Sequence, residues 1–355
     1  MIHGAPGPLQ IMIIAGWDIG GAHLKAAVAQ DGRITGAWQV ACPVWQGRGQ
    51  LDAAFLLVLA RMADAGLARI DRHVCTMTAE LSDIFASRDE GVAALAQAAM
   101  RHLGADTGVY AGPAGFVPAG EAGCHVAAIA SANWHASAAL VAARLQDAVL
   151  VDFGSTTTDI VPVTGGAVAA RGYSDAGRLL AGELVYTGLV RSFVMSIVGA
   201  VPFRGAASPL MHEYFANMAD VYRVLGELPE DADMQATADG RSKTVEASRA
   251  RLARMIGREA GEGTPQDWRG LALAFKRAQM RTIEKALLQV LSASVPDDAP
   301  LVVAGAGLHV AAEIAAGLGR RCIRFASLLD CAPDARAMAA HCAPASALAL
   351  LASAQ

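Results

Sequence analysis

The sequence is poor in charged and aromatic residues. Asp, Glu, Lys and Arg make up only 17% of its 355 residues and aromatic residues only 5%, whereas hydrophobic residues make up 54%. This composition excludes an intrinsically disordered chain, and the length is sufficient for two domains with large buried cores. Because few charges are available to cover the surface, we consider a homo-oligomer, in which a second copy covers apolar area.

The sequence also has no excess of basic residues. It contains 29 Lys and Arg against 33 Asp and Glu, for a net charge of −4. The arginines between Arg241 and Arg281 are interleaved with acidic residues, which is typical of a solvated helical surface rather than of a surface that binds nucleic acid. We therefore expect no nucleic-acid partner.

Membrane segments and metal-binding cysteine pairs are missing as well. The apolar stretch at residues 11–15 is far too short to span a bilayer, and the N-terminus has neither the basic start nor the cleavage site of a signal peptide. The six cysteines form no C-x-x-C pair, and no histidines cluster with metal-binding spacing, so we expect reduced thiols. These features predict a cytoplasmic protein with no membrane partner.

The sequence does contain a strand–turn–strand pattern that occurs twice. The apolar run at 11–20 ends in Asp-Ile-Gly, and strand-like runs follow at 24–30 and 33–41. Residues 148–163 repeat this order around Asp-Phe-Gly, and a third run follows at 167–173. This repeat predicts a duplicated α/β fold with a cleft between two lobes. We place the lobes at 1–146 and 147–355, with a helical insertion at about 191–295.

Helical periodicity predicts most of the remaining elements. The helices are expected at 50–65, 89–103, 131–145, 212–226, 244–257, 267–292 and 308–318. Ser131 is a suitable N-cap for the third of these helices, and Tyr214 belongs to the apolar stripe of the fourth, so we assign Tyr214 to the core.

The first Asp-x-Gly turn has the composition of a phosphate-binding turn. Gly20 and Gly21 allow the backbone to approach a ligand, with amides directed at phosphate oxygens. Asp18 is expected to hold Mg²⁺ through water, and Lys25 to neutralise phosphate charge. On its own, such a turn between strands is more often only a turn.

The second turn is richer in hydroxyl groups. Gly154 is followed by Ser155, Thr156 and Thr157, whose amides and hydroxyls together form a candidate anion cradle. Asp152 supplies a second carboxylate for a shared Mg²⁺. The ordinary alternative is that these threonines are simply residues that favour β-structure.

A third glycine turn comes late in the chain. Gly305 and Gly307 follow the apolar run at 301–304 and precede a helix, an arrangement that accepts an anion or a nucleoside. A tight strand-to-helix turn without a ligand is the alternative.

The order of these three turns resembles the acetate and sugar kinase, Hsp70 and actin superfamily, and the second turn is most similar to that of the hydantoinase/oxoprolinase group. Several runs also resemble a branch of that group linked to the tetrahydromethanopterin-dependent one-carbon pathway; they lie at 75–85, 182–188, 213–228, 237–244 and 248–259. The resemblance implies an actin-like (ribonuclease H-like) fold with two lobes and a central cleft. Ala306 stands where ATP-binding relatives often carry glycine, which leaves ATP binding open.

The resemblance also implies a reaction. The branch is expected to act in the biosynthesis of methanofuran or of its bacterial counterpart methylofuran. The implied enzyme is a transferase that joins an aminomethyl-furan-methyl diphosphate to the phenol of a tyramine or tyrosine derivative, with Mg²⁺ as cofactor and diphosphate as leaving group. Two alternatives stay open: an ATP-dependent small-molecule kinase or hydantoinase/oxoprolinase-type enzyme, and a non-catalytic nucleotide sensor.

The phenol must lose its proton in this reaction, and four residues are candidates for the base. Glu80 and Asp83 follow a predicted strand, where they could instead stabilise a helix N-terminus. Glu183 could equally belong to the first turn of a helix. His23 lies within the first phosphate turn, or it simply faces solvent.

A polar segment at 229–243 supplies candidates for substrate binding. Asp239, Arg241 and Lys243 could hold a carboxylate of the acceptor, or they could form an exposed charged loop.

Overall fold

The computed structural model describes residues 11–293 and 295–355 and divides the chain into two compact units. Unit 1 comprises the residues up to Leu140 together with Ala326–Gln355, and unit 2 comprises Val141–Phe325. This division differs from the expected one, which assigned the C-terminal residues to the second lobe. Helix α11 (Ala343–Ser353) packs against β1 (Ile13–Ile19), and this contact ties the C-terminus to unit 1.

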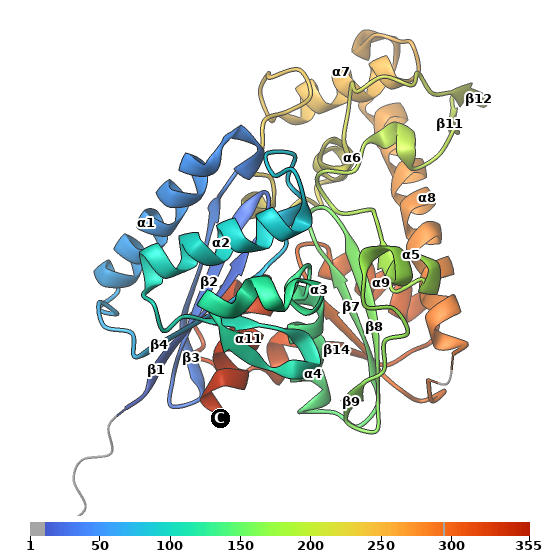
Figure 1. The fold of residues 1–355 in the computed structure, drawn as a ribbon. Helices are drawn as coiled ribbons and strands as arrows, with labels where there is room; N and C mark the ends of the chain where they lie inside the picture. Colours follow the sequence, from blue (N-terminus) through green and yellow to red (C-terminus); the bar gives the residue numbers. More distant parts are fainter. Residues whose placement is uncertain (1–10, 294) are drawn as a thin grey trace, which may run out of the picture. The chain divides into compact units, whose positions relative to one another are not determined.

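Unit 1 is built on a six-stranded mixed sheet (Figure 1). The first three strands form an antiparallel meander, and β4 and β5 then run parallel to β1. The strand order across the sheet is β3 (Arg33–Ala41), β2 (His23–Gln30), β1, β4 (Arg72–Met77), β5 (Gly108–Tyr110) and β6 (Phe116–Pro118).

Successive side chains of β1 point to opposite faces of the sheet, and in unit 1 a helix covers each of these faces. Trp17 packs on Phe55 of α1 (Arg48–Asp64), with ring centroids 5.4 Å apart. On the other face, a side chain at Gly16 would lie 2.7 Å from the backbone nitrogen of Ala349 in α11. Further helices of the unit are α2 (Arg88–Leu103), α3 (Val126–Ile129), α4 (Asn133–Ala142), which crosses into unit 2, and α10 (Arg336–His341).

Unit 2 repeats this topology. Antiparallel β7 and β8 take the places of β1 and β2, and β13 and β14 run parallel to β7. The order is β10 (Leu184–Val185), β8 (Thr158–Thr164), β7 (Ala148–Phe153), β13 (Leu301–Ala304) and β14 (Cys322–Arg324), with β9 (Ala167–Val168) also paired to β8. The predicted duplication of an α/β unit is therefore confirmed.

The predicted strand at 167–173 is much shorter in the structure. Only Ala167–Val168 pairs with β8, because the backbone amides of Arg171 and Gly172 bind the carboxylate of Glu183 instead of a neighbouring strand. Glu183 follows α5 (Asp175–Ala181), whose last turn is closed by Gly182 in the left-handed conformation.

The helical insertion of unit 2 contains α6 (Met218–Leu225), α7 (Val245–Met255), α8 (Pro265–Leu291) and the hairpin of β11 (Ala200–Phe203) and β12 (Ala206–Pro209). Helix α8 begins with a capping box between Thr264 and Asp267, and Pro265 occupies its first turn. Helix α9 (Leu308–Gly317) follows the late glycine turn.

Candidate functional site

The first Asp-x-Gly turn lies at the carboxyl ends of β1 and β4, the edge of an open α/β sheet at which ligands usually bind. Asp18 is 5% exposed and lies opposite Lys25 on β2 and Thr76 on β4. Paired residues of neighbouring strands share a face of the sheet, so unit 1 brings the predicted Asp18 and Lys25 together.

A segment that the sequence did not connect with this turn lies beside it. The Nζ of Lys25 donates to the carbonyl oxygen of His341 at 3.3 Å. Burial lowers the pKa of His341 to about 4, and the Lys25 charge acts in the same direction. Burial likewise raises the pKa of the Cys342 thiol to about 12, and Asp18 adds to this rise. The α10–α11 junction therefore forms part of the surroundings of Asp18.

The two Asp-x-Gly turns are closed by the same hydrogen bond. The amide of Gly20 donates to the carbonyl of His23 at 3.0 Å, and that of Gly154 donates to the carbonyl of Thr157 at 2.9 Å. These two amides are used within the turns, which corrects the expectation that Gly20 directs its amide at a phosphate. Within the described part of the chain, the amides of Gly21 and Ser155 have no backbone hydrogen-bond partner. They are therefore better suited to donate hydrogen bonds to a phosphate.

The candidate bases of unit 1 differ in their surroundings. Glu80 is 1% exposed, and its carboxylate accepts a hydrogen bond of 2.8 Å from the hydroxyl of Ser131. Asp83, by contrast, is exposed. His23 is buried at 7% exposure, so the alternative that it faces solvent is wrong.

Ser131 is not the N-cap that the sequence suggested. Helix α4 begins at Asn133, and Ser131 has a φ of +54°, in the left-handed region that disfavours residues other than glycine. Its hydroxyl binds Glu80 rather than a helix amide. Glu80 lies beside the first turn, since a side chain at Gly21 would come within 3.9 Å of the Cα of the adjoining Ala79.

Residues 187–192 pack against the second turn and bind its backbone. The amides of Val190 and Arg191 donate to the carbonyl of Ser155 at 3.1 and 2.9 Å. Gly188 lies so close to the turn that a side chain there would be 2.5 Å from the same carbonyl oxygen. Ser155 and Thr156 are therefore fixed by their backbone, while both residues remain partly exposed.

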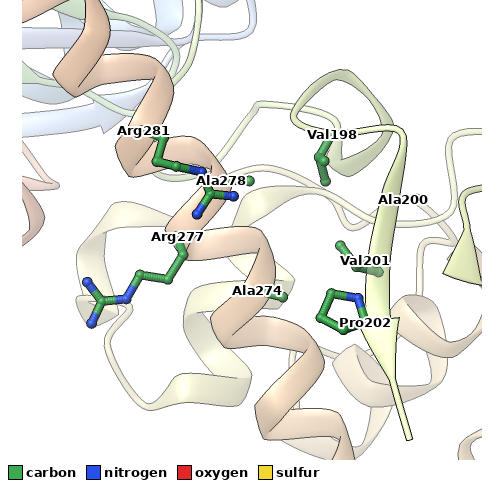
Figure 2. Close-up of a pocket in the computed structure, with 8 residues that line it drawn as sticks. All are labelled: Val198, Ala200, Val201, Pro202, Ala274, Arg277, Ala278 and Arg281. Carbon is green, nitrogen blue, oxygen red and sulfur yellow. The ribbon is translucent and has the colours of Figure 1, made fainter. Parts of the chain in front are cut away.

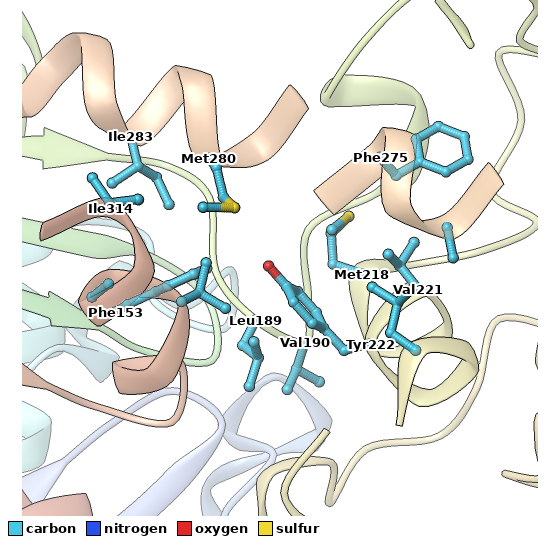
Figure 3. Close-up of a cluster of buried hydrophobic side chains, with 14 of the residues drawn as sticks. Phe153, Leu189, Val190, Met218, Val221, Tyr222, Phe275, Met280, Ile283 and Ile314 are labelled. Carbon is cyan, nitrogen blue, oxygen red and sulfur yellow. The ribbon is translucent and has the colours of Figure 1, made fainter. Parts of the chain in front are cut away.

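A buried polar network holds this supporting segment. The Gln279 amide donates to the hydroxyl of Thr187 at 2.8 Å and to the carbonyl of Gly188 at 2.9 Å, and it accepts from the Tyr222 hydroxyl at 2.7 Å. Figure 3 shows Tyr222 among the apolar residues of this core, with Leu189, Val190 and Phe153 nearby. Packing and hydrogen bonds together thus preorganise the second turn.

Asp159 is a site residue that the sequence analysis missed. It lies opposite Asp152 in the β7–β8 pair, at the position that Lys25 occupies opposite Asp18 in unit 1. Its carboxylate pairs with the guanidinium of Arg178 at 2.9 Å, and the Arg178 side chain is 2% exposed. The spacing of seven residues between the two aspartates, across a tight turn, was the available signal.

The late glycine turn packs directly on the second phosphate turn within unit 2. Gly305 has a φ of +81°, and a side chain there would overlap the Asp152 carboxylate and lie 2.5 Å from the carbonyl oxygen of Phe153. The amide of Gly307 donates to that carbonyl at 2.8 Å. Both positions require glycine because of close approach, and Asp152 is placed at the carboxyl ends of β7 and β13.

Glu183 does not suit the predicted role of a base. It is fully buried, and its two carboxylate oxygens accept from the amides of Arg171 at 2.6 Å and Gly172 at 3.0 Å. The carboxylate therefore shapes the segment that follows β9.

Two of the three predicted carboxylate-binding residues are likewise engaged in structure. Asp239 pairs with Arg251 at 3.0 Å and with Arg254 at 3.4 Å, and Lys243 donates to the carbonyl of Asp233 at 2.7 Å. Arg251 is fully buried and also binds Asp220 of α6. These ion pairs hold the 229–243 segment to α6 and α7 and leave only the exposed Arg241 available for a ligand.

An aromatic pair lies next to the support of the second turn. The rings of Phe193 and Tyr214 are 4.5 Å apart, and the two residues are 44% and 38% exposed. Tyr214 precedes the Asn217 cap of α6, so its assignment to a helical core stripe is wrong. Burial raises the pKa of Tyr214, while the charge of Arg191 acts in the opposite direction. The backbone amide of Arg191 also donates to the carbonyl of Ser155.

Most of this chain is similar to known proteins. The family model described as hydantoinase/oxoprolinase matches residues 71–335. The chain belongs to the hydantoinase/oxoprolinase family. A relative from Methanocaldococcus jannaschii, named (4-{4-[2-(gamma-L-glutamylamino)ethyl]phenoxymethyl}furan-2-yl)methanamine synthase, is 32% identical over 249 residues, which cover 70% of this chain and 72% of the relative.

A protein of the same name from Methanococcus vannielii is 32% identical over 111 residues, covering 31% of this chain and 50% of that protein. Both relatives are named as synthases, which indicates that this chain is an enzyme. Among solved structures, nucleotide-free acetone carboxylase aligns with a TM-score of 0.61 at 11% identity, covering 96% of this chain and 70% of the carboxylase. This likeness supports an actin-like α/β fold. No helix within residues 11–293 or 295–355 has the length and hydrophobicity of a membrane span.

Proposed function

We propose that this hydantoinase/oxoprolinase family member forms an aryl ether in the biosynthesis of a methanofuran-type cofactor. The observation that carries the proposal is the similarity to the Methanocaldococcus synthase over most of both chains. The product in that name contains a phenoxymethyl group on a furan, that is, a phenol oxygen bonded to a CH₂ on the ring. The reaction joins the oxygen of a phenol in a tyramine or tyrosine derivative to the CH₂ of an aminomethyl-furan-methyl diphosphate.

The reaction places a clear demand on the protein. The phenol oxygen forms a bond to the CH₂ carbon, the bond from that carbon to diphosphate breaks, and the phenolic proton passes to a base. Positive charge at the carbon is delocalised by the furan ring, so the barrier depends on stabilising the departing diphosphate. The amide of Ser155 and the hydroxyls of Ser155 and Thr156, held by the 187–192 segment, are suited to bind that anion.

The carboxylates at the turns fit Mg²⁺, because this ion prefers oxygen ligands and is usually bound by one or two carboxylates together with substrate phosphates. Within the described residues no three His, Cys, Asp or Glu side chains gather as a metal site, which is compatible with such sparse protein ligation. Asp152 at the second turn is the residue of unit 2 that would hold it, and Asp18 is its counterpart at the first turn of unit 1. Bound Mg²⁺ would neutralise charge on the diphosphate.

The acceptor needs a surface for its aromatic ring and a base for its proton. Phe193 and Tyr214 offer exposed ring faces beside Arg191, and aromatic pairs of this kind stabilise a further ring. A phenol has an ordinary pKa of about 10, so its proton must be removed at neutral pH. Of the two carboxylates of unit 1 predicted as bases, Glu80 is oriented by the Ser131 hydroxyl, whereas Asp83 is exposed.

The test is mass spectrometry of a reaction that contains the purified protein, Mg²⁺, the furan diphosphate and tyrosine, tyramine or γ-glutamyltyramine, without ATP. We expect an ether product and free diphosphate, and the preferred acceptor identifies the physiological one. Asp152→Asn is expected to lower kcat/KM on the order of 100-fold. Asp147→Asn, directly before the start of β7, is the matched control and should retain activity.

An absence of product without ATP, together with ATP turnover, would reject this proposal in favour of an ATP-dependent enzyme. Acetone carboxylase, whose structure is similar, is described as ATP-dependent. A second reaction with added ATP is therefore the appropriate comparison. Under that outcome the turn of Gly305 and Gly307 would be tested as the nucleoside site.

A further inference from the structure

Unit 2 contains a groove that none of the proposed chemistry uses. It lies between α8 and strand β11 of the β11–β12 hairpin, together with Val198 just before that strand, and its volume is about 260 Å³ (Figure 2). Its walls are apolar apart from two arginines; the lining residues are Val198, Ala200, Val201, Pro202, Ala274, Ala278, Arg277 and Arg281. No acidic side chain lines the groove.

The two arginines give this groove a positive charge. Arg277 and Arg281 are exposed, and within the described residues neither guanidinium group has an ion pair or a hydrogen bond. Figure 2 shows the Arg281 guanidinium on the side of α8 that faces the groove, whereas that of Arg277 extends away from it. Like charges four residues apart on a helix repel each other, and a bound anion would remove this repulsion.

The groove is separate from the second phosphate turn. The support of that turn is bound by Gln279, two residues from each arginine. Each residue of an α-helix is rotated by about 100° from the previous one, so Gln279 lies about 160° around α8 from Arg277 and Arg281. The helix therefore presents one face to the phosphate turn and the opposite face to the groove.

We propose that this groove binds a small molecule with an apolar body and a carboxylate. The apolar walls would contact the body, and Arg281, with Arg277 after a rotation of its exposed side chain, would bind the carboxylate through charge-assisted hydrogen bonds. The volume is slightly below the 300–1,000 Å³ or so of pockets for drug-sized ligands, which favours a compact ligand. This site does not depend on the proposed ether-forming reaction.

Isothermal titration calorimetry on the full chain tests the site with 4-phenylbutanoate as the probe. We expect saturable binding at one site per chain. The neutral analogue 4-phenylbutanol, which keeps the apolar body, and butanoate, which lacks the ring, should each bind on the order of tenfold more weakly. Equal affinity for the acid and the alcohol would overturn the role of the arginines.

Variants assign the binding to this groove. Arg281→Ala should weaken 4-phenylbutanoate on the order of tenfold and Arg277→Ala less, because only the Arg281 guanidinium already faces the groove. Lys285→Ala, which removes an exposed positive charge on α8 one turn beyond Arg281 and outside the lining, is the matched control and should not change the affinity.

A variant that fills the groove distinguishes binding inside the groove from simple attraction of anions to the surface of α8. Ala274→Phe places a ring among the apolar walls and keeps both arginines, so it should abolish binding, whereas attraction of anions to the helix surface would survive. Circular dichroism confirms that the variant is folded, and Val198→Phe, on the opposite wall, provides a second filling variant. Binding that persists in both folded variants, or that Lys285→Ala reduces as much as Arg281→Ala, would overturn the proposal.

Discussion

At the scale of single residues, the candidate site of unit 2 depends on glycines that permit close contact. Gly305 carries both a left-handed backbone and a contact with the β7 turn, whereas Gly319 has a φ of +64° and open space around it. The two positions therefore separate the cost of backbone conformation from the cost of contact.

We predict that Gly319→Ala lowers the free energy of unfolding by about 1 kcal/mol, the cost of the left-handed conformation alone. Gly305→Ala should lower it by about 3 kcal/mol, because its new methyl group also overlaps the Asp152 carboxylate and the Phe153 carbonyl. Urea denaturation measures both. Equal losses in the two variants would show that the late turn does not press on the phosphate turn.

Arg178 provides a prediction about pH. Burial raises the pKa of Asp159, and Arg178 partly offsets the rise. A carboxyl whose pKa is higher in the folded state stabilises the fold at low pH, and this stabilisation is lost as the pH rises from its unfolded pKa of about 4 through the folded one. Arg178→Met removes the offset and leaves a buried charge, so we expect a loss of about 3 kcal/mol at pH 8 and a smaller loss at pH 4.5.

The double variant Arg178→Met with Asp159→Asn is the control for this measurement. It removes the charge that Arg178 compensates, so most of the stability at pH 8 should return and the difference between the two pH values should disappear. A loss in Arg178→Met that is independent of pH would assign the effect to packing of the arginine side chain instead.

At the scale of elements, the packing of α11 on β1 determines the surroundings of the first turn. Gly16 and Asp18 point to the same face of the sheet, and α11 covers this face at Gly16. Because a side chain at Gly16 would collide with backbone atoms, the helix cannot yield by moving a side chain alone.

Gly16→Ala is therefore expected to lower the free energy of unfolding by about 3 kcal/mol, the upper range for overpacking a core. Gly120→Ala, in unit 1 with open space around it, should change the free energy by less than about 0.5 kcal/mol. Chemical denaturation measures both. A neutral Gly16→Ala variant would show that α11 is not held against β1.

The elements that the sequence predicted well are those with a local signal. Strands β1 and β7 end in Asp-x-Gly, and glycine with alternating apolar residues marks the turn and the strands without reference to the rest of the chain. The long helix α8 has a capping box and a helical apolar stripe, both readable in sequence. The duplicated α/β pattern and the positions of the two Asp-x-Gly turns followed from such signals.

The features that the sequence did not reveal depend on contacts between distant segments. Nothing in the alanine-rich residues 343–353 indicates that β1 is their partner, since apolar helices of this kind fit many surfaces. Glu183 was predicted as a base or as a residue in the first turn of a helix, because the sequence does not show its amide partners at 171 and 172. Asp239 looked available for a ligand because its partner Arg251 belongs to another element.

At the scale of the whole molecule, the two units differ in how the chain builds them. Unit 2 is one continuous segment, Val141–Phe325, with its own apolar core. Unit 1 is discontinuous, because Ala326–Gln355 returns to the sheet formed by the beginning of the chain. Removal of the last thirty residues should therefore affect the two units unequally.

We predict that a chain ending at Phe325 loses the fold of unit 1 and keeps that of unit 2. The truncation exposes the face of β1 that α11 buries, and an uncovered apolar sheet face is not stable in water. Hydrogen exchange measured by mass spectrometry should show loss of protection in β1, β2 and β4, with β7, β8 and β13 still protected. Trp268, the one tryptophan of unit 2, is 1% exposed and should retain its buried fluorescence. Protection that persists in β1, or that disappears equally from β7, would contradict the assignment of the C-terminal segment to unit 1 alone.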